Sequence, residues 1–360
     1  MRLERIVPGT RPTSDVDGAV LVRDLVVDGE RWSKGRRLTA SDLATLGAPG
    51  VRVAGEPRAL AEAGIAVLVA EAADLHEDDA ALRLAAAVAG PGLTTRGPAE
   101  SRVDLLAATD GLLHVRADLV ERMDRIDPVE VFTLFDGQVV RAGDLVGSVK
   151  VAPHVVPAEV IERAERVALR AGLRGVIRVA GFTRRRVAAL VKESVHAPAR
   201  ERFEASVRLK VESLGSELAS VTYVADAAGP VTDALRSLVR GPIAGRADLV
   251  LTAGSASTDP EDPFYVAIER LGGRVVRHGV PAHPGSMLWL ARIGHTELLG
   301  LPSCGAYSKA TAADLLLPRL LSGEPASAAT VARLGVGGIL TRSMRFRFPA
   351  YARDLDAPDG

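Results

Sequence analysis

From about residue 174 the chain alternates short apolar runs with helical stretches, and this alternation constrains the fold more than any other feature of the sequence. Strands that alternate with helices form mainly parallel sheets with helices covering them. We therefore expect an α/β fold in this half of the chain. The expected elements are a strand at Val176–Val179, a helical stretch through about Leu214, a strand at Leu218–Val224, a helix at Val231–Val239, a strand at Asp248–Leu251, a helix at Phe264–Leu271 and strands at Arg274–Arg277, Met287–Ile293 and Thr296–Leu299.

The first half differs, because its apolar runs are separated by turn signals. Asp28-Gly29, Asp110-Gly111 and Asp136-Gly137 each lie between apolar segments, as a tight hairpin turn with positive φ requires. Ala80–Val88 is rich in Ala and Leu and is followed by Gly90-Pro91, which favours a single helix that ends there. We therefore expect a β-rich α+β N-terminal region.

The length of 360 residues suggests two domains of about 150 residues each. Between the two halves, Ala158–Leu169 has helical spacing, follows Pro157 and precedes Gly172, which predicts a bridging helix. The expected organisation is a β-rich N-terminal region at 1–155 with room for two subdomains, the bridging helix at 156–173, the α/β domain at 174–324 and a C-terminal tail at 325–360.

Composition excludes several classes of partner. Lys plus Arg and Asp plus Glu number 45 each, so no overall field attracts nucleic acid or an anionic membrane. The single cysteine, Cys304, excludes an internal disulfide and a multi-cysteine metal site, as expected in a reducing compartment. No stretch is apolar over the roughly 20 residues of a membrane span, and the charged N-terminus is unlike a signal peptide. We expect a cytoplasmic protein.

The loop after the predicted strand Asp248–Leu251 consists mainly of small and hydroxylated residues. Thr252–Asp262 lets backbone N–H groups approach an anion, and Ser255 and Ser257 add hydroxyls near the helix that begins at Pro263, which suits a phosphate. Asp259, Glu261 and Asp262 would repel a bare phosphate, unless Mg²⁺ bridges carboxylate and phosphate oxygens. The alternative is that Asp262 only caps the following helix.

A second loop of small residues follows the last predicted strand. Gly300–Gly305 precedes an apolar helix at Ala306–Leu321, and the turn-rich link Gly279–Ser286 can present its backbone to the same cleft. Arg184-Arg185-Arg186, after the predicted first strand, could hold an anion or form a solvated helix face. Walker-type, Gly-x-Gly-x-x-Gly and paired-histidine zinc motifs do not occur, which argues against the common nucleotide, dehydrogenase and zinc sites.

Three stretches resemble the molybdopterin-binding domains of molybdenum cofactor synthesis. Asp248–Ser255 with Asp259–Asp262 is similar to their strand–TGG–loop–Asp signature. Leu271–Val280 leads to Pro284-Gly285, and Gly300-Leu301-Pro302 precedes the last helix, as in the MoeA and Mog-like proteins. The resemblance covers most of the chain, strongly only in residues 245–324. It is to the MoeA-related proteins, which carry a Mog-like domain behind a β-containing N-terminal region.

This resemblance implies a three-layer α/β/α Mog-like domain at 174–324 whose loops hold a phosphorylated pterin, molybdopterin. It implies Mg²⁺ and an essential aspartate, which corresponds to Asp262 here, as the catalytic residue. The metal ligands would be Asp259 and Asp262. The pterin-binding positions carried over or expected from these loops are Gly181, Thr252, Gly254, Ser255, Ser257, Pro284, Gly285, Pro302 and Ser303.

The activity implied is either adenylylation of molybdopterin or insertion of molybdate into the adenylylated form, and the N-terminal extension favours the insertion transferase. Departures from the family pattern support a non-catalytic carrier or sensor as the alternative. The TGG step is Ala253-Gly254-Ser255, the TGSE-like step is Ala180–Thr183, and Ser286-Met287 replaces a lysine common after Pro-Gly. A molybdenum enzyme and a second copy of the chain are the partners expected besides the pterin.

Overall fold

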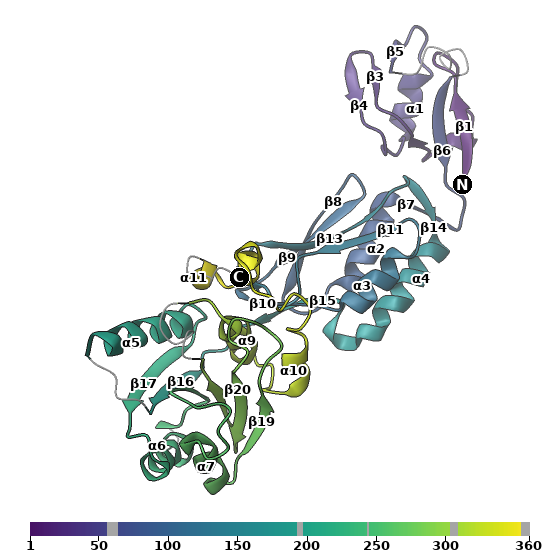
Figure 1. The fold of residues 1–360 in the computed structure, drawn as a ribbon. Helices are drawn as coiled ribbons and strands as arrows, with labels where there is room; N and C mark the ends of the chain where they lie inside the picture. Colours follow the sequence, from purple (N-terminus) through teal and green to yellow (C-terminus); the bar gives the residue numbers. More distant parts are fainter. Residues whose placement is uncertain (56–63, 193–196, 243–244, 303–308, 354–360) are drawn as a thin grey trace. The chain divides into compact units, whose positions relative to one another are not determined.

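The computed structural model describes residues 1–55, 64–192, 197–242, 245–302 and 309–353 (Figure 1). The chain divides into two compact units. Unit 1 comprises Met1–Ala108, Val115–Asp136 and Ala142–Arg178, and unit 2 comprises Thr109–His114, Gly137–Arg141 and Val179–Gly360. No helix among the described residues is long and apolar enough to cross a membrane.

The N-terminal part of unit 1 is built from two small antiparallel sheets. One has the order β1-β6-β2, and the other has the order β4-β3-β5. Asp28 and Gly29 have φ angles of 48° and 89° and join β3 to β4, which confirms the turn predicted there. The strands are β1 Arg2–Ile6, β2 Val20–Leu21, β3 Leu25–Val27, β4 Glu30–Trp32, β5 Val53–Ala54 and β6 Ile65–Val69, with 3₁₀ helix η1 at Ser14–Val16 and helix α1 at Ala40–Leu46.

The rest of unit 1 consists of a four-stranded antiparallel sheet, in the order β11-β13-β9-β8, with helices packed on it (Figure 1). The predicted helices are confirmed as α2, which follows His76 and ends before Gly90, and α4, which follows Pro157. The elements are β7 Asp74–His76, α2 Glu77–Val88, β8 Leu93–Ala99, β9 Arg102–Ala107, α3 Ala117–Asp124, β11 Val129–Thr133, β13 Leu145–Val151, β14 Val155–Pro157, α4 Ala158–Ala168 and 3₁₀ helix η3 Leu169–Arg174.

Two predicted hairpins in this region are wrong. Asp110-Gly111 separates β9 from β10 (Gly111–Val115), but β10 pairs with β12 (Val139–Val140), while β9 pairs with β8 and β13. Asp136-Gly137 likewise separates β11 from β12, which lie in different sheets. An Asp-Gly pair specifies a change of direction, whereas long-range burial decides which strands pair.

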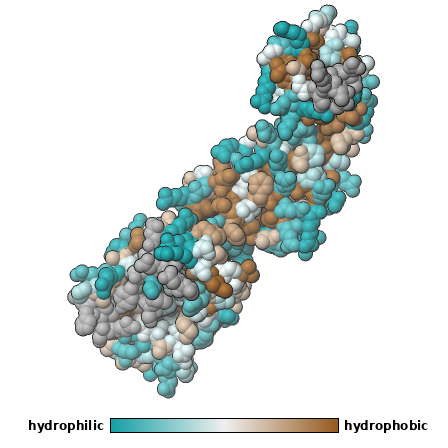
Figure 2. Space-filling model, turned by 45° about the horizontal axis from the view of Figure 1, so that its top comes forward, coloured by the Kyte–Doolittle hydropathy of each residue, from teal (hydrophilic) through white to brown (hydrophobic). Residues whose placement is uncertain are grey.

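Apolar side chains remain on the surface of unit 1. Figure 2 shows hydrophobic residues gathered in the middle of the view. The exposed apolar side chains of the β11–β13 region are Phe132, Leu134, Phe135 and Leu145.

Unit 2 contains a six-stranded sheet with the order β17-β16-β18-β21-β20-β19. β17, β16, β18 and β21 are parallel, and β20 and β19 run antiparallel to their neighbours. The strands are β16 Arg186–Val191, β17 Glu217–Tyr223, β18 Leu249–Ala253, β19 Arg274–His278, β20 Trp289–Ile293 and β21 Thr296–Gly300. The mainly parallel sheet expected from the alternation is therefore confirmed.

Helices cover both faces of this sheet, which gives the three-layer α/β/α arrangement (Figure 1). Odd-numbered residues of β16, such as Val187 and Val191, pack in one core with α5 and α9, and even-numbered ones, such as Leu190, pack in a second core with α6 and α7. The helices are α5 Ala197–Glu212, α6 Ala228–Arg240, α7 Pro263–Arg270 and α9 Ala312–Leu321. The central strands β16 and β18 are almost entirely apolar because both of their faces are buried.

The predicted first strand of this sheet is wrong. Val176–Val179 overlaps β15 (Ile177–Gly181), which lies in a separate sheet of order β12-β10-β15. The first strand of the six-stranded sheet is instead β16, within the stretch predicted to be helical. Its run Val187–Val191 contains two alanines, which favour a helix, but an unbroken apolar run of this length also suits a fully buried parallel strand.

The C-terminal residues belong to unit 2 as well. Leu334, Leu340, Phe348 and Ala352 lie in the same core as α5 and α9. The elements here are α10 Ala328–Ala332, 3₁₀ helix η5 Arg342–Arg347 and α11 Ala350–Arg353.

Candidate functional site

The loops selected from the sequence meet at the carboxyl edge of the six-stranded sheet. Thr252 of β18 lies opposite Gly300 of β21, and the Leu301 N–H donates to the Thr252 carbonyl at 2.8 Å. The Lys192 N–H, just after β16, donates to the Ala253 carbonyl at 3.2 Å. Loops and helix starts converge at such an edge, where α/β domains bind their ligands.

Asp262 holds the loop after β18, residues 254–262, against the start of α7. The residue is 1% exposed. Oδ1 accepts the Phe264 N–H at 2.9 Å, and Oδ2 accepts the Ala256 N–H at 2.6 Å. The helix cap that the sequence left open for Asp262 is therefore present, with Pro263 as the first helical residue.

A buried lysine forms an ion pair with this aspartate. Lys192 Nζ lies 3.1 Å from Asp262 Oδ2 and 2.8 Å from Asp226 Oδ1, and its side chain is 3% exposed. Burial disfavours the charged ammonium, but hydrogen bonds to Asp226 and Asp262 outweigh burial and raise the pKa of Lys192. Neither Lys192 nor Asp226 was expected from the sequence as a site residue. The sequence signal for Lys192 was its position directly after an apolar run. Because the alanines of that run favour a helix, the run was not expected to be a strand that ends at the ligand site.

Two aromatic side chains hold the 254–262 loop to the sheet. Trp289 Nε1–H donates to Ser255 Oγ at 3.0 Å, and the Tyr265 hydroxyl donates to the Ser257 carbonyl at 3.0 Å. Burial, with a smaller contribution from the charge of Asp262, raises the pKa of Tyr265 to about 12, so this hydroxyl stays a donor at neutral pH. Gly300 is required beneath Trp289, because a Cβ there would lie 2.2 Å from the indole ring.

Several polar groups of this edge have no protein partner within the described ranges. The backbone N–H groups of Gly254, Ser255 and Ser257 donate to no acceptor there. Thr252 is fully buried at the end of β18, and its hydroxyl has no hydrogen-bond partner. Buried polar groups are normally paired, so an unpartnered hydroxyl beside unpaired N–H groups marks this edge as a place for a polar ligand.

Pro284 and Gly285 lie at the start of α9. The Pro284 carbonyl accepts the Ala312 N–H at 2.9 Å. Gly285 has a φ of 100°, and a Cβ there would lie 2.9 Å from Thr311 Cβ, so only glycine fits. Pro302 is buried directly after β21, while Ser303 lies outside the described residues.

Gly181 is not brought to this edge. It ends β15, ahead of the amino end of β16. The next residues bond elsewhere, since the Thr183 N–H donates to the Leu321 carbonyl at the far end of α9. Arg184, which could have held an anion or formed a solvated helix face, lies 3.2 Å from Glu217 at the start of β17. The error follows from taking β15 for the first strand of the domain.

The carboxylates present do not fit the expected Mg²⁺. Both oxygens of Asp262 accept backbone N–H groups, and Oδ2 also contacts the Lys192 ammonium. Asp259 is exposed and its Oδ1 accepts the Glu261 N–H at 2.9 Å. In the part of the chain that the structure describes, no group of three His, Cys, Asp or Glu side chains could hold a metal ion.

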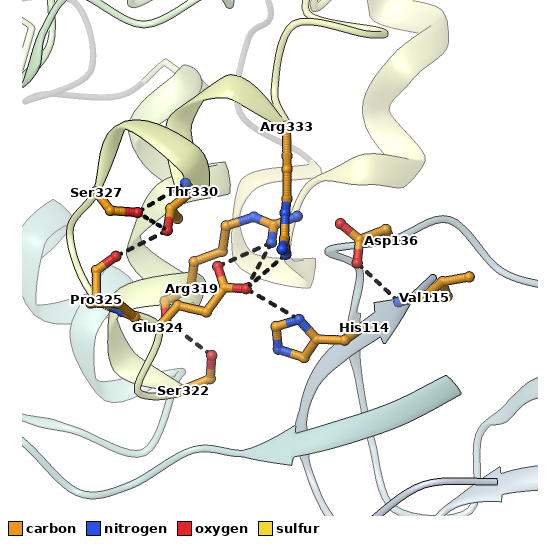
Figure 3. Close-up of polar contacts among 10 residues, drawn as sticks. All are labelled: His114, Val115, Asp136, Arg319, Ser322, Glu324, Pro325, Ser327, Thr330 and Arg333. Carbon is orange, nitrogen blue, oxygen red and sulfur yellow. Dashed lines mark hydrogen bonds and ion pairs between the residues drawn. The ribbon is translucent and has the colours of Figure 1, made fainter. Parts of the chain in front are cut away.

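A second charged cluster surrounds Glu324 (Figure 3). Glu324 lies 3.1 Å from Arg319, 3.3 Å from Arg333 and 3.2 Å from His114 Nδ1. Burial alone would raise the pKa of Glu324, but the contact with His114 and the charge of Arg319 outweigh burial and lower it to about 2. The Ala326 N–H donates to Glu297 near the start of β21 at 2.8 Å, which places this cluster by the amino ends of the strands.

Comparison with known proteins identifies a family for the segment that forms this site. Residues 192–322 match the model of a probable molybdopterin binding domain. No curated protein matches the sequence. Among solved structures, the molybdopterin biosynthesis MoeA protein of Pyrococcus horikosii is 16% identical, covering 70% of this chain and 81% of that chain with a TM-score of 0.28. The molybdopterin biosynthesis enzyme MoaB of Thermus theromophilus is 22% identical, covering 39% of this chain and 98% of that chain, with a TM-score of 0.28.

Both TM-scores are low. The family of residues 192–322 is therefore given by the sequence match. The matched segment begins at Lys192 and includes the 254–262 loop, Pro284-Gly285 and the start of α9. It therefore contains all the carboxyl-edge residues described above, from Lys192 to Pro302. The chain contains, over residues 192–322, a domain of the molybdopterin-binding family of molybdenum cofactor biosynthesis proteins.

Proposed function

We propose that the carboxyl edge of the six-stranded sheet binds molybdopterin and that the protein inserts molybdate into the adenylylated form. The observation that carries the proposal is the set of polar groups, on Thr252 and the 254–262 loop, that have no partner among the described residues and lie within the segment that matches the family. Backbone N–H groups and hydroxyls on a loop with little side-chain bulk suit the terminal phosphate of a pterin.

The residues at this edge would act by holding and orienting the ligand. The N–H groups of Gly254, Ser255 and Ser257 would donate to phosphate oxygens, and the buried Thr252 hydroxyl would replace its missing partner with a ligand atom. Molybdate is a substrate in this scheme. Insertion needs no nucleophilic side chain, because positioning molybdate against the pterin sulfurs and stabilising the departing AMP supply the rate enhancement.

A carrier or sensor without turnover is the second candidate, and one observation favours it. Asp262, the residue that the family resemblance makes essential, is fully occupied by the Ala256 and Phe264 N–H groups and by Lys192. A carboxylate used in this way stabilises the loop and helix whether or not chemistry takes place. A carrier would keep the affinity for the pterin and release no AMP.

The experiment uses the fluorescence of Trp289, which contacts the proposed site through Ser255. The chain has two tryptophans, so Trp32→Phe leaves Trp289 as the only reporter. Molybdopterin is titrated into this protein, and adenylylated molybdopterin with molybdate is then supplied while AMP is measured. Saturable quenching with AMP release supports insertion, quenching without release supports the carrier, and no binding contradicts both.

A matched pair of glycine substitutions localises the binding. Gly254 has a φ of 91°, so Gly254→Ala strains the loop and crowds its N–H groups, and it should weaken binding at least tenfold. Gly181→Ala is the control, because the nearest atom that a Cβ there would meet is the Thr109 methyl carbon, at an ordinary 3.4 Å. Equal affinities for the two variants would place the pterin elsewhere.

Two further proposals concern protein partners. Self-association would cover the exposed apolar side chains Phe132 and Leu145 of unit 1, and Phe132→Ser should then lower the mass measured by light scattering. The second proposed partner is a molybdenum enzyme, to which the protein would deliver the bound pterin. The test is whether the pterin-loaded protein activates a molybdenum enzyme that lacks its cofactor.

A further inference from the structure

We infer that Lys192 takes the place of the divalent cation expected beside Asp262, so that this site holds its anionic pterin without Mg²⁺. The inference rests on the proposed molybdopterin binding and concerns which cation that site uses. Its basis is the arrangement of Lys192, Asp226 and Asp262 at the carboxyl edge of the sheet.

The ammonium lies where a bridging cation would have to lie. Lys192 Nζ is 2.8 Å from Asp226 Oδ1 and 3.1 Å from Asp262 Oδ2. The two carboxylates come from the loops after β17 and β18, and among the described residues it is the lysine that joins them. A cation between two carboxylates at a strand edge is the usual environment of Mg²⁺ in phosphate sites, and here a side chain of the protein supplies the positive charge.

The lysine cannot leave this position easily. Its side chain is 3% exposed, Nζ lies 5.9 Å from the centre of the Phe264 ring, and the Lys192 backbone is tied to β18 by its hydrogen bond to Ala253. A divalent ion on Asp262 Oδ2 would have to displace the ammonium and leave it buried with the exposed Asp226 as its remaining partner, which is unfavourable. The raised pKa of Lys192 keeps the group charged at neutral pH.

The remaining acidic groups do not provide an alternative metal site. Asp262 Oδ1 is occupied as the cap of α7. Asp259 and Glu261 are exposed and belong to a turn in which Asp259 accepts the Glu261 N–H. Among the described residues, the positive charge beside Asp262 comes from Lys192, and the ligand phosphate would meet N–H groups and hydroxyls rather than a metal ion.

The test compares pterin affinity with EDTA and with excess Mg²⁺, using Trp289 fluorescence in the Trp32→Phe protein. The wild-type dissociation constant should agree within about twofold in the two conditions. Lys192→Ala should bind at least tenfold more weakly in EDTA, because Asp226 and Asp262 then repel the phosphate, and Mg²⁺ should restore the affinity by joining the two carboxylates. Lys34→Ala, which removes an exposed lysine of unit 1, is the matched control and should behave as wild type.

The outcomes separate this inference from the proposed function. Wild-type binding that is lost in EDTA and restored by Mg²⁺ would overturn the role of Lys192 and leave pterin binding intact. No binding in either condition would overturn the proposed function and this inference with it. The wild-type comparison needs no variant, so it decides the question even if Lys192→Ala fails to fold, and calorimetric titration of the pterin-free wild type with Mg²⁺ should show no saturable heat.

Discussion

The two edges of the six-stranded sheet in unit 2 each carry a buried charged cluster, but the groups around the two clusters differ. At the amino edge, Glu324 accepts hydrogen bonds from Arg319 and Arg333 and lies 3.2 Å from His114 Nδ1. At the carboxyl edge, the Lys192–Asp262 pair lies beside a loop whose N–H groups have no acceptor in the described structure and beside the unpartnered hydroxyl of Thr252.

The comparison shows that buried charge alone does not identify a functional site. Both clusters lower the cost of burying ions by pairing them, and both shift the pKa values of their members. What distinguishes the carboxyl edge is that three backbone N–H groups of one loop have no acceptor among the described residues, whereas the unpaired atoms at the amino edge are side-chain nitrogens such as those of His114. Variants at the two edges should therefore separate effects on stability from effects on ligand binding.

The largest effect is expected for Asp262→Ala. The change removes the cap of α7 and leaves Lys192 buried beside only the exposed Asp226, which should destabilise the protein by about 4 kcal/mol. Urea denaturation followed by Trp289 fluorescence measures the loss. Asp259→Ala is the control and should change stability by less than about 0.5 kcal/mol, because Asp259 is exposed. Equal losses for both variants would show that the buried pair does not stabilise the site.

At the opposite edge, Glu324→Gln should destabilise the protein by about 3 kcal/mol, because Arg319 is left buried without its charged partner. Pterin affinity should not change. Arg333→Ala provides the comparison, since this arginine is 54% exposed and its removal should cost less than about 1 kcal/mol. A loss of pterin binding in Glu324→Gln would break the distinction between a structural and a ligand-binding edge.

The same cluster predicts a pH dependence. The pKa of Glu324 is lowered to about 2 in the folded protein, so its contribution is fully present above its ordinary pKa and is lost as the pH falls. Between about pH 6 and pH 3 roughly 2 kcal/mol of stability should disappear. Denaturation of wild type and Glu324→Gln across this range measures the difference, which should narrow toward low pH. A constant difference would mean that the charge of Glu324 is not what stabilises the cluster.

A smaller effect is expected where the loop meets the sheet. Ser255→Ala leaves the buried Trp289 Nε1–H without its acceptor, which should cost about 1.5 kcal/mol. It should also weaken pterin binding severalfold, because the loop is no longer held in place. Thr258→Ala, an exposed position of the same loop, should be neutral in stability. If both variants bind the pterin equally well, loop position is not important for affinity.

The smallest effect has the opposite sign. Thr252→Val replaces a buried hydroxyl that has no partner in the described chain with a methyl group of similar size, and it should stabilise the pterin-free protein by about 1 kcal/mol. Pterin affinity should fall, since the hydroxyl would be paired only in the complex. A variant that is stabilised and binds as tightly as wild type would remove Thr252 from the site.

The fold was largely predictable because the alternation of strands and helices persists over many residues. The strand and helix at Asp248–Leu251 and Phe264–Leu271 were found at the predicted positions, since their apolar periodicity agrees with their burial. β16 was missed because an apolar run that contains alanines is compatible with either structure. This error moved the expected first loop to Gly181, and Lys192 was overlooked as a result.

The sequence by itself determined the small-residue loops, the cap at Asp262 and the mainly parallel sheet, because these depend on local chemistry and on the period of apolar residues. Only the tertiary structure decided that Lys192 and Asp226 meet Asp262, and that Asp110-Gly111 and Asp136-Gly137 separate strands of different sheets. Residues 70 positions apart in the chain become neighbours only through strand order. Strand order depends on packing across the whole core, which no local pattern records.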